Sequence, residues 1–332
     1  MRTLVLGGTA MLSRTVAEAA RDAGHDVTCL ARGRSGEPPE GVRFVRADRA
    51  EPGGYDGLTG EFDAVVDVAR RPSEVRSALA ALAGRVGHWT FVSTCNVYSD
   101  DATPGQVADT APLVAPAPAD VDESDQENYG ICKRACEVAV VDAMGADRSF
   151  LCRAGLIVGP RDSVVRFGYW PDRLARGGEV LAPGDPDRPV QVIDVRDLSD
   201  WIVRAGVDGL AGAYDGTGAP VPMREFLARI AAGVGVEPKL TWVDQEFLVE
   251  QGVNPWAGKR SLPLWLPLPE YGGFLRRDVT RSLAAGLRTR DLAETARDTL
   301  AWTRESWRPH ERDGGITAED ESALLAAWHA RP

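Results

Sequence analysis

A tyrosine and a lysine lie one helical turn apart in the segment "NYGICKRACE", residues 128–137. Tyr129 and Lys133 therefore share one face of any helix that forms here. A free phenol has a pKa near about 10, so it is a poor proton donor or acceptor at neutral pH. An ammonium group one turn away favours the phenolate and lowers that pKa. The pair is thus suited to move a proton to or from a carbonyl or hydroxyl oxygen.

Two hydroxyl side chains stand where a buried strand is expected to end. In "HWTFVSTCNVYSD" an apolar run is followed by Ser93 and Thr94. Ligands of open α/β sheets bind outside the carboxyl ends of the strands. A hydroxyl there can hold a substrate oxygen while Tyr129 transfers its proton. The alternative is that both hydroxyls make only capping or turn contacts.

The opening "RTLVLGGTAMLSR" predicts a strand, a glycine turn and the start of a helix. A dinucleotide-binding turn has glycine at three set places, which Gly7, Ala10 and Ser13 occupy here. The first glycine permits the tight turn, the second lets backbone approach the pyrophosphate, and the third lets the helix pack on the strand. Ala10 and Ser13 are small, and the helix N-terminus still offers N–H donors. We expect weakened or shifted cofactor binding, and the alternative is a relic site.

Alternating strand and helix patterns continue along the chain and position these residues. Short apolar runs such as "DVTCLARG", "FDAVVDVA" and "SFLCRAGLIVG" alternate with amphipathic stretches such as "PSEVRSALAALAG". This βαβ alternation predicts an α/β fold with a Rossmann-type doubly wound parallel sheet. Residues 100–127 are rich in Pro, Ala and Asp and predict a long surface loop, followed by a helix from about Asn128 to Met144.

The chain is long enough for two lobes, with 332 residues. We expect residues 1–160 with 194–217 to form the dinucleotide-binding domain, and residues 161–193 with 218–332 a smaller substrate-binding lobe. The tail is dense in Pro and aromatic residues, which either pack against one another or form a hydrophobic cap over the substrate. Candidate substrate contacts in this lobe are Trp170, Gln191 and Trp256.

Composition restricts the partners. The formal net charge is −11, from 38 basic and 49 acidic residues. An acidic surface repels nucleic-acid backbones and anionic membranes. No apolar run approaches the roughly 20 residues of a membrane span, and no signal peptide is recognisable, so we expect a cytoplasmic protein. The five cysteines are odd in number and form no C-x-x-C motif, which predicts free thiols and no metal site.

Five blocks occur in register: "LVLGGTAMLSR", "FDAVVDVA", "FVSTCNVYSD", "YGICK" and "RAGLIVGPRD…QVIDVRDL". Together they resemble the extended branch of the short-chain dehydrogenase/reductase superfamily, the NAD(P)-dependent epimerase/dehydratase-like proteins. The resemblance is strong to about residue 220 and weak in the tail. It is more specific for the fold than for the reaction.

The resemblance implies roles for individual positions. Tyr129 matches the catalytic tyrosine and Lys133 the lysine that tunes it and holds the nicotinamide ribose. Thr94 matches the catalytic Ser/Thr, and the neighbouring Ser93 could share this role. The remaining implied cofactor contacts are Gly7, Thr9, Ala10, Met11 and Leu12 in the turn, Asp48 near adenine, and Val68 and Ala69 beside the adenosine half and the nicotinamide ribose.

Cofactor choice follows from the end of the second strand. NAD-preferring sites carry an acidic residue there, which binds the ribose 2′-hydroxyl. Here Ala31 takes that position, and Arg32 and Arg34 follow. Guanidinium groups suit a 2′-phosphate, so we expect NADP(H) to be favoured over NAD(H). The alternative is that both arginines are solvated loop charges.

Three functions fit these residues. The first is an NADPH-dependent oxidoreductase that reduces a carbonyl of a small metabolite, or oxidises the alcohol. The second is a redox-neutral nucleotide-sugar epimerase or dehydratase; Cys95 and Asn96 after Thr94 disfavour the dehydratase, which often has acidic residues there. The third is a non-catalytic binding protein with a degenerate cofactor loop. Family habit also suggests a homodimer.

Overall fold

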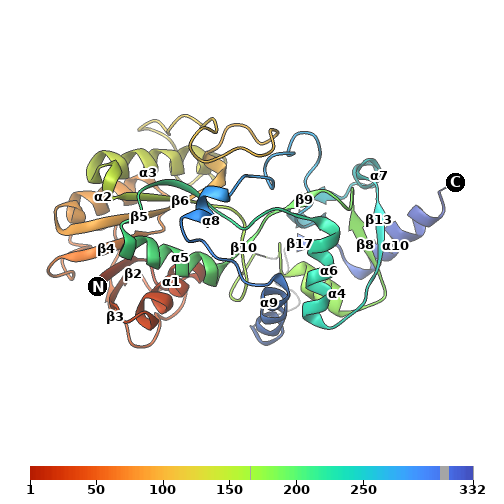
Figure 1. Ribbon diagram of the computed structural model, residues 1–332, viewed down its shortest axis with the longest axis horizontal. Coiled ribbons are helices and arrows are strands. Elements are labelled where there is room, and N and C mark those ends of the chain that lie inside the picture. The colour runs from red at the N-terminus through yellow and green to blue at the C-terminus, as the bar shows by residue number, and fades with distance from the viewer. Residues whose placement is uncertain (165, 307–313, 332) are drawn as a thin grey trace.

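A seven-stranded parallel sheet forms the centre of the first lobe (Figure 1). The computed structural model describes residues 1–164, 166–306 and 314–331. Every neighbouring strand pair in the sheet is parallel, as the alternating pattern predicted. In spatial order the strands are β3 (Arg43–Arg46), β2 (Asp26–Ala31), β1 (Arg2–Leu6), β4 (Phe62–Asp67), β5 (Val86–Thr94), β6 (Ser149–Ala154) and β11 (Gly212–Gly216). The doubly wound Rossmann-type fold is thus confirmed.

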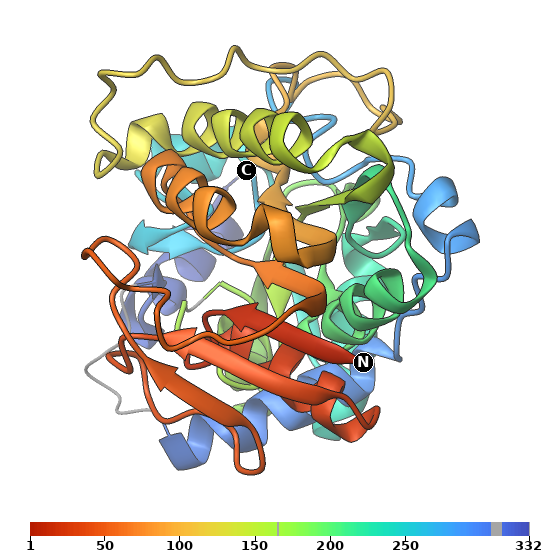
Figure 2. The same cartoon turned by 90° about the vertical axis from the view of Figure 1, so that its left-hand side faces the viewer.

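Both faces of the sheet are covered by helices because its strands are apolar on both sides. Leu4 and Leu6 of β1 pack in one core with α2 (Pro72–Leu82) and α3 (Tyr129–Met144). Val5, which points to the opposite face, packs in another with α1 (Met11–Asp22) and α5 (Val195–Asp208). Figure 2 shows this layering from the side of the sheet.

The strand order reverses at β1, whose neighbours are β2 and β4. The crevice at such a switch point is where open α/β sheets bind their ligands. The carboxyl ends of β1, β4 and β5 carry the glycine turn, Ala69 and Thr94 respectively. The topology therefore gathers the predicted cofactor turn and the predicted catalytic hydroxyl at one edge.

A hydrophobic core separate from the two that flank the sheet, here called the second core, lies in the half of the molecule that carries the C-terminus (Figure 1). Its main elements are α4 (Tyr169–Ala175), β8 (Glu179–Pro183), α6 (Met223–Val234), β13 (Lys239–Val243), α9 (Leu292–Ser306) and α10 (Ala318–His329). The parallel strands β8 and β13 form a small separate sheet. The sequence did not predict α10, although Thr317 caps it by accepting a hydrogen bond from the Asp320 amide at 3.0 Å.

The remaining elements are short. They are β7 (Ile157–Val158), β9 (Pro189–Val190), β10 (Ile193–Asp194), β12 (Val221–Pro222), α7 (Gln245–Glu250), β14 (Asn254–Pro255), β15 (Gly258–Lys259), β16 (Ser261–Leu262), α8 (Thr280–Ala284) and β17 (Gly314–Gly315). The domain boundaries expected from the sequence stay a prediction; residues 165, 307–313 and 332 of the expected second lobe lie outside the described residues.

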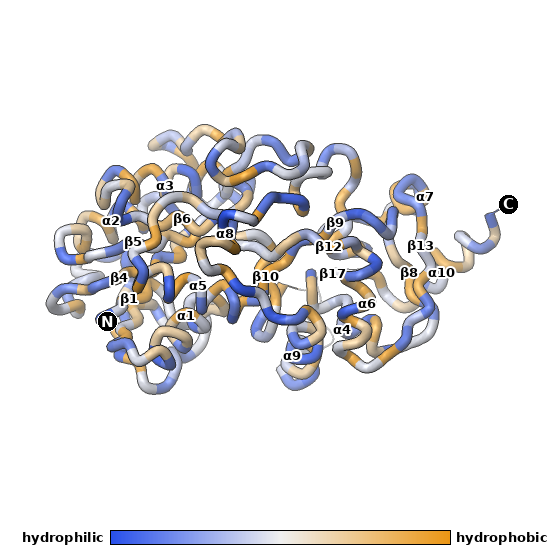
Figure 3. The backbone as a smooth tube through the Cα atoms, in the orientation of Figure 1, coloured by the Kyte–Doolittle hydropathy of each residue, from blue (hydrophilic) through white to orange (hydrophobic). Residues whose placement is uncertain are grey.

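Residues 100–125 form the predicted long loop, with one isolated bridge between Tyr98 and Leu113. The loop runs along the outer side of α3 and contacts it where the Ala117 amide donates to the Ile131 carbonyl (Figures 1 and 2). Hydropathy along the backbone is shown in Figure 3. Within the described ranges, no helix combines the length and the apolar character that a membrane crossing requires.

Candidate active site

Tyr129 and Thr94 meet at the carboxyl end of β5. A hydrogen bond links the side chains of Thr94 and Tyr129. The Thr94 hydroxyl donates its own proton to Oδ1 of Asn96 at 2.9 Å. The residue after the tyrosine allows this approach, because a Cβ atom at Gly130 would overlap the carbonyl oxygen of Asn96. The first turn of α3 can therefore lie directly against the turn that follows β5. The dipeptide "YG" is the local sequence feature that brings the two hydroxyl groups together.

Lys133, one helical turn after Tyr129 on α3, is held in place by backbone contacts. Its side chain is only 2% exposed, and its ammonium group donates to the carbonyl oxygens of Ala69, at 2.8 Å, and Val92. The ammonium nitrogen also lies 4.1 Å from the centre of the Phe91 ring, which favours the cation. Burial lowers the pKa of Lys133 to about 8. The lysine thus joins α3 to the ends of β4 and β5.

The loop that receives Lys133 is held by a buried carboxylate. Asp67, the last residue of β4, is fully buried and accepts from the Ala69 amide at 3.0 Å and from Arg49 at 3.1 Å. These bonds fix Val68 and Ala69, the positions that the resemblance assigns to cofactor contacts. The sequence analysis did not single out Asp67 or Arg49.

The electrostatic expectation for Tyr129 needs a correction. The sequence predicted that Lys133 lowers the phenol pKa, but burial raises it in this structure. Thr94, Arg70 and Arg166 act in the opposite direction, because a hydrogen bond and two positive charges favour the phenolate. Lys133 instead directs its donors at two carbonyl oxygens. The two arginines are therefore the charges that favour the phenolate here, and the motif gave no sign of them.

The glycine turn keeps its glycine at position 7, where the backbone has a positive φ. Gly7 has φ +144°, and a Cβ atom there would lie 2.8 Å from the Cβ of Ser13. Ser13 is 2% exposed and donates to the Ala10 carbonyl at 3.2 Å, so its hydroxymethyl group fills the space beside Gly7 without a clash. Ala10 is exposed and forms the N-cap of α1 without a side-chain bond.

These features fit a dinucleotide phosphate. Because Ala10 supplies no capping oxygen, the first amides of α1, those of Met11 and Leu12 among them, remain available to an anion at the positive end of the helix. Thr9, just before the cap, is buried. The N-terminus of α1 and Gly7 would hold the pyrophosphate, and Ala69 and Lys133 would lie at the nicotinamide ribose.

Arginines gather at the ends of β2 and β3. Arg32 is half-exposed and forms an ion pair with Asp48 at 3.7 Å. Arg46 lies opposite Ala31 in the register of these strands and donates to the Arg32 carbonyl at 3.4 Å. Arg34 is exposed in the following loop. The sequence predicted Arg32 and Arg34 as the cationic residues at this position, and the structure adds Arg46.

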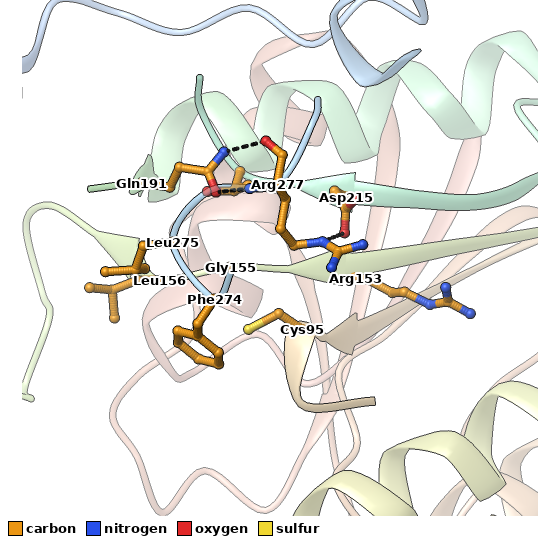
Figure 4. Close-up of a pocket in the computed structure, with 10 residues that line it drawn as sticks. Cys95, Arg153, Gly155, Leu156, Gln191, Asp215, Phe274, Leu275 and Arg277 are labelled. Carbon is orange, nitrogen blue, oxygen red and sulfur yellow. Dashed lines mark hydrogen bonds and ion pairs between the residues drawn. The ribbon is translucent and has the colours of Figure 1, made fainter. Parts of the chain in front are cut away.

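A small cavity of about 10 Å³, enough for roughly one water molecule, lies near the carboxyl end of β5 (Figure 4). Its lining includes Cys95, Gln191, Asp215, Thr217, Phe274 and Arg277. Cys95 follows Thr94 directly in the chain, so the cavity lies next to the position that matches the catalytic Ser/Thr. Asp215 is the penultimate residue of β11, a position that strand-end reasoning could have found. Phe274 and Arg277 come from an irregular segment with no such signal.

The three candidate substrate residues have different surroundings. Trp256 lies near the site, with Arg166 5.3 Å from its ring and Phe274 in edge contact at 5.6 Å. Gln191 lines the cavity, but its amide is occupied by Gly218 and Arg277. Trp170 needs a correction: it is fully buried in the second core and donates to the Pro263 carbonyl at 2.9 Å, so it leaves no surface for a ligand.

Comparison with known proteins agrees with this arrangement. The model of the NAD-dependent epimerase/dehydratase family matches residues 3–212. The chain belongs to this family. It is therefore an NAD(P)-dependent enzyme of the short-chain dehydrogenase/reductase superfamily, as the five sequence blocks indicated.

Individual relatives of the family are distant. The chain is 27% identical over 265 residues to 2′-dehydrokanamycin reductase of Streptomyces kanamyceticus, covering 76% of this chain and 72% of that protein. The NAD⁺ complex of WbmH from Bordetella bronchiseptica is 20% identical, with a TM-score of 0.63, over 92% of this chain and 99% of the other. The UDP-Glc/GlcNAc 4-epimerase of Campylobacter jejuni is 15% identical, with a TM-score of 0.66, over 92% and 99%. These two structures share the fold.

Proposed function

We propose that this enzyme is an NADP(H)-dependent reductase that converts a carbonyl group of a small metabolite into an alcohol. The observation that carries the proposal is the contact between Tyr129 and Thr94 at the end of β5, with Lys133 anchored beside the cofactor positions. A proton donor and an oxygen-binding hydroxyl at one point are what carbonyl reduction requires.

The residues divide the reaction among them. Gly7, the N-terminus of α1 and Lys133 would hold the dinucleotide, whose chemistry when bound would be hydride donation to a carbonyl carbon. Thr94 donates a hydrogen bond to the carbonyl oxygen, which takes up the electron pair of the broken C–O π bond. Tyr129 gives that oxygen its proton, and water restores the phenol. The raised pKa of Tyr129 keeps the phenol protonated at neutral pH, as a proton donor must be.

The preference for NADP(H) rests on the arginines at the ends of β2 and β3. No acidic residue follows Ala31 directly; Arg32 and Arg34 follow it, and Arg46 donates to the Arg32 carbonyl. The ion pair between Arg32 and Asp48 is half-exposed, so Arg32 can exchange it for a phosphate at little cost. A guanidinium group binds phosphate with two parallel hydrogen bonds.

The relative called 2′-dehydrokanamycin reductase supports net reduction. The family description supports the redox-neutral alternative, in which an epimerase takes a hydride from its substrate and returns it. The two reactions differ in cofactor balance. A reductase consumes one NADPH per product, whereas an epimerase forms an isomer without net consumption.

The test is to incubate the protein with NADPH and a panel of cyclic ketones, following absorbance at the nicotinamide band and the products by mass spectrometry. We expect stoichiometric NADPH oxidation and products heavier by two hydrogens. Isomerised nucleotide sugars without net NADPH loss would establish the epimerase instead. If neither NADPH nor NADH raises the melting temperature of the protein, both reactions are contradicted.

A further inference from the structure

A cavity of about 140 Å³ lies beside Tyr129. A single water molecule needs only roughly 10–15 Å³, so the cavity accepts a group of several non-hydrogen atoms. One wall is formed by Arg70 and Arg71, which follow Ala69, and the other by residues 123–126 at the end of the long loop. Tyr129 itself lines the cavity. A substrate whose carbonyl group meets the phenol can therefore place a substituent there.

Arg70 brings an unpaired positive charge to this cavity. Its guanidinium lies 5.9 Å from the centre of the Tyr129 ring, and among the described residues its side chain makes no hydrogen bond and no ion pair. Arg71 differs, because its charge acts on the carboxylate of Asp122. Arg70 is exposed, so a ligand in the cavity can reach it. An anion bound to Arg70 stands close to the carbonyl that Tyr129 protonates.

A second arginine acts on Tyr129 from the loop before α4. The Arg166 guanidinium lies 5.3 Å from the centre of the Trp256 ring, and its charge favours the Tyr129 phenolate. Nε of Arg166 is buried without a hydrogen-bond partner in the described part of the chain. Asp162 forms no ion pair with it there and accepts from the Val164 amide at 2.9 Å instead. A buried charge without a partner is costly, so an anionic ligand stabilises Arg166.

The acidic residues of the cavity are already engaged. Glu123 accepts from the Ser73 amide at 3.0 Å with one carboxylate oxygen and from the Ser73 hydroxyl with the other. Asp125 accepts from the Glu127 amide at 2.9 Å and caps the turn before α3. These donors offset the negative charge of both carboxylates, whereas Arg70 has no such partner. The cavity thus offers unused N–H donors, which suit a group that only accepts hydrogen bonds.

We propose that Arg70 and Arg166 bind an oxyanion, a carboxylate or a phosphate, carried on the first or second carbon from the reacting carbonyl, so that the substrate is an acidic ketone. The inference rests on the proposed reductase function. An oxyanion accepts from the guanidinium groups and neutralises their charge, and such bonds are stronger than neutral ones. A carboxamide of the same shape brings no charge, and an ammonium group is repelled by both arginines.

The experiment compares 3-oxocyclohexane-1-carboxylate with its carboxamide, with 3-oxocyclohexylphosphonate and with 3-aminocyclohexanone. Calorimetry on the wild type with saturating NADP⁺ measures binding without turnover, because the oxidised cofactor carries no hydride to transfer. We expect at least one oxyanion to bind about tenfold more tightly than the carboxamide, and the amine to bind most weakly. Whichever oxyanion binds more tightly identifies the group as carboxylate or phosphate. The preference should shrink as the salt concentration rises.

Variants assign this preference to the two arginines. We expect Arg70→Gln and Arg166→Gln each to reduce the ratio of oxyanion to carboxamide affinity at least about threefold, with NADP⁺ affinity within about twofold of the wild type. Arg166→Lys keeps the charge and should retain more of the preference than Arg166→Gln. The matched control is Arg76→Gln, an exposed arginine on α2 outside the cavity, which should leave the ratio unchanged. Because Arg70 is exposed, its variant keeps the test available if Arg166→Gln does not fold.

The outcomes separate this inference from the proposed function. Equal binding of the oxyanions and the carboxamide, or no binding of any ketone, overturns the oxyanion site, whether or not NADPH is oxidised. A preference that persists in both Gln variants also overturns it. So does a loss of NADP⁺ affinity in Arg70→Gln with an unchanged preference, because Arg70 then contacts the cofactor. Selective binding of an oxyanion ketone without NADPH oxidation by the wild type supports the site and contradicts the reductase.

Discussion

Lys133 donates to the main-chain oxygen of Ala69 at 2.8 Å and thereby joins α3 to the loop after β4. The lysine is fully surrounded by protein, and burial lowers its pKa from 10.5 to about 8. The contact fixes the side chain at the expected nicotinamide ribose. It also makes the stability of the protein depend on pH, because a buried ammonium group disfavours folding.

Lys133→Met should reveal this dependence. Below pH 8 the lysine is charged in the folded and unfolded protein, so the wild type bears the full desolvation penalty. Between pH 8 and 10.5 the unfolded chain binds more protons, so the wild type gains stability relative to the Met variant as the pH rises. Urea unfolding of both proteins from pH 7 to 11 measures the difference. A pH-independent difference would show that Lys133 titrates normally.

Tyr129→Phe should lower kcat about 10²–10⁴-fold and leave the Kd for NADPH within about twofold of the wild type. The phenol supplies the proton but is not required to hold the dinucleotide. Steady-state kinetics and fluorescence titration measure the two quantities. Tyr169→Phe is the control, because it removes a phenol hydroxyl that is buried in the second core and has no hydrogen-bond partner. Wild-type turnover in Tyr129→Phe would refute the catalytic assignment.

Arg166→Met should raise the pKa of Tyr129, since a positive charge that favours the phenolate is removed. In the oxidation direction, where Tyr129 acts as the base, the acid limb of the kcat/KM profile should move to higher pH. NADP⁺ reduction with 1,2-cyclohexanediol across pH 6–10 gives this profile. Arg70→Gln should shift it in the same direction, and the exposed Arg204→Gln on α5 should not. An unchanged profile in both site variants would contradict the electrostatic role.

Arg32→Ala should weaken NADPH binding about tenfold and change NADH binding by less than twofold, because only NADPH carries the 2′-phosphate. Fluorescence titration with both cofactors gives the ratio of the NADPH affinity to the NADH affinity. In the wild type this ratio falls as the salt concentration rises if the contact with the 2′-phosphate is ionic. Arg76→Ala, an exposed arginine on α2, serves as the control. Equal losses for the two cofactors would mean that Arg32 acts on the fold of the loop instead.

Gly7→Ala should reduce NADPH affinity at least about tenfold and lower the melting temperature. A methyl group there meets Ser13 at 2.8 Å, in a backbone conformation with φ +144° that other residues rarely adopt. Gly84→Ala is the control, since nothing lies within 4 Å of the added carbon. Ala10→Gly should leave NADPH affinity within about twofold, because Ala10 is exposed and its methyl group is no obstacle. A large gain in that variant would show that the methyl group does obstruct the phosphate.

The order of strands and helices could be predicted because each carries its own periodicity. Apolar runs such as "TLVL", with amphipathic stretches between them, predict a parallel sheet from local spacing alone. The same local logic placed Thr94 at a strand end and Tyr129 and Lys133 on one helix face. Their electrostatics could not be predicted this way, because burial and the charges of Arg70 and Arg166 depend on distant segments.

The sequence by itself thus determined the Rossmann-type sheet, the glycine turn and the pair Tyr129 and Lys133, because short-range spacing specifies each of them. Only the tertiary structure decided that Asp215 meets Arg277 and that Trp170 lies in a core. Arg277 belongs to an irregular segment without periodicity, so its position is set by long-range packing against the end of β11. Contacts of this kind follow from no local pattern, so the structure is needed to locate them.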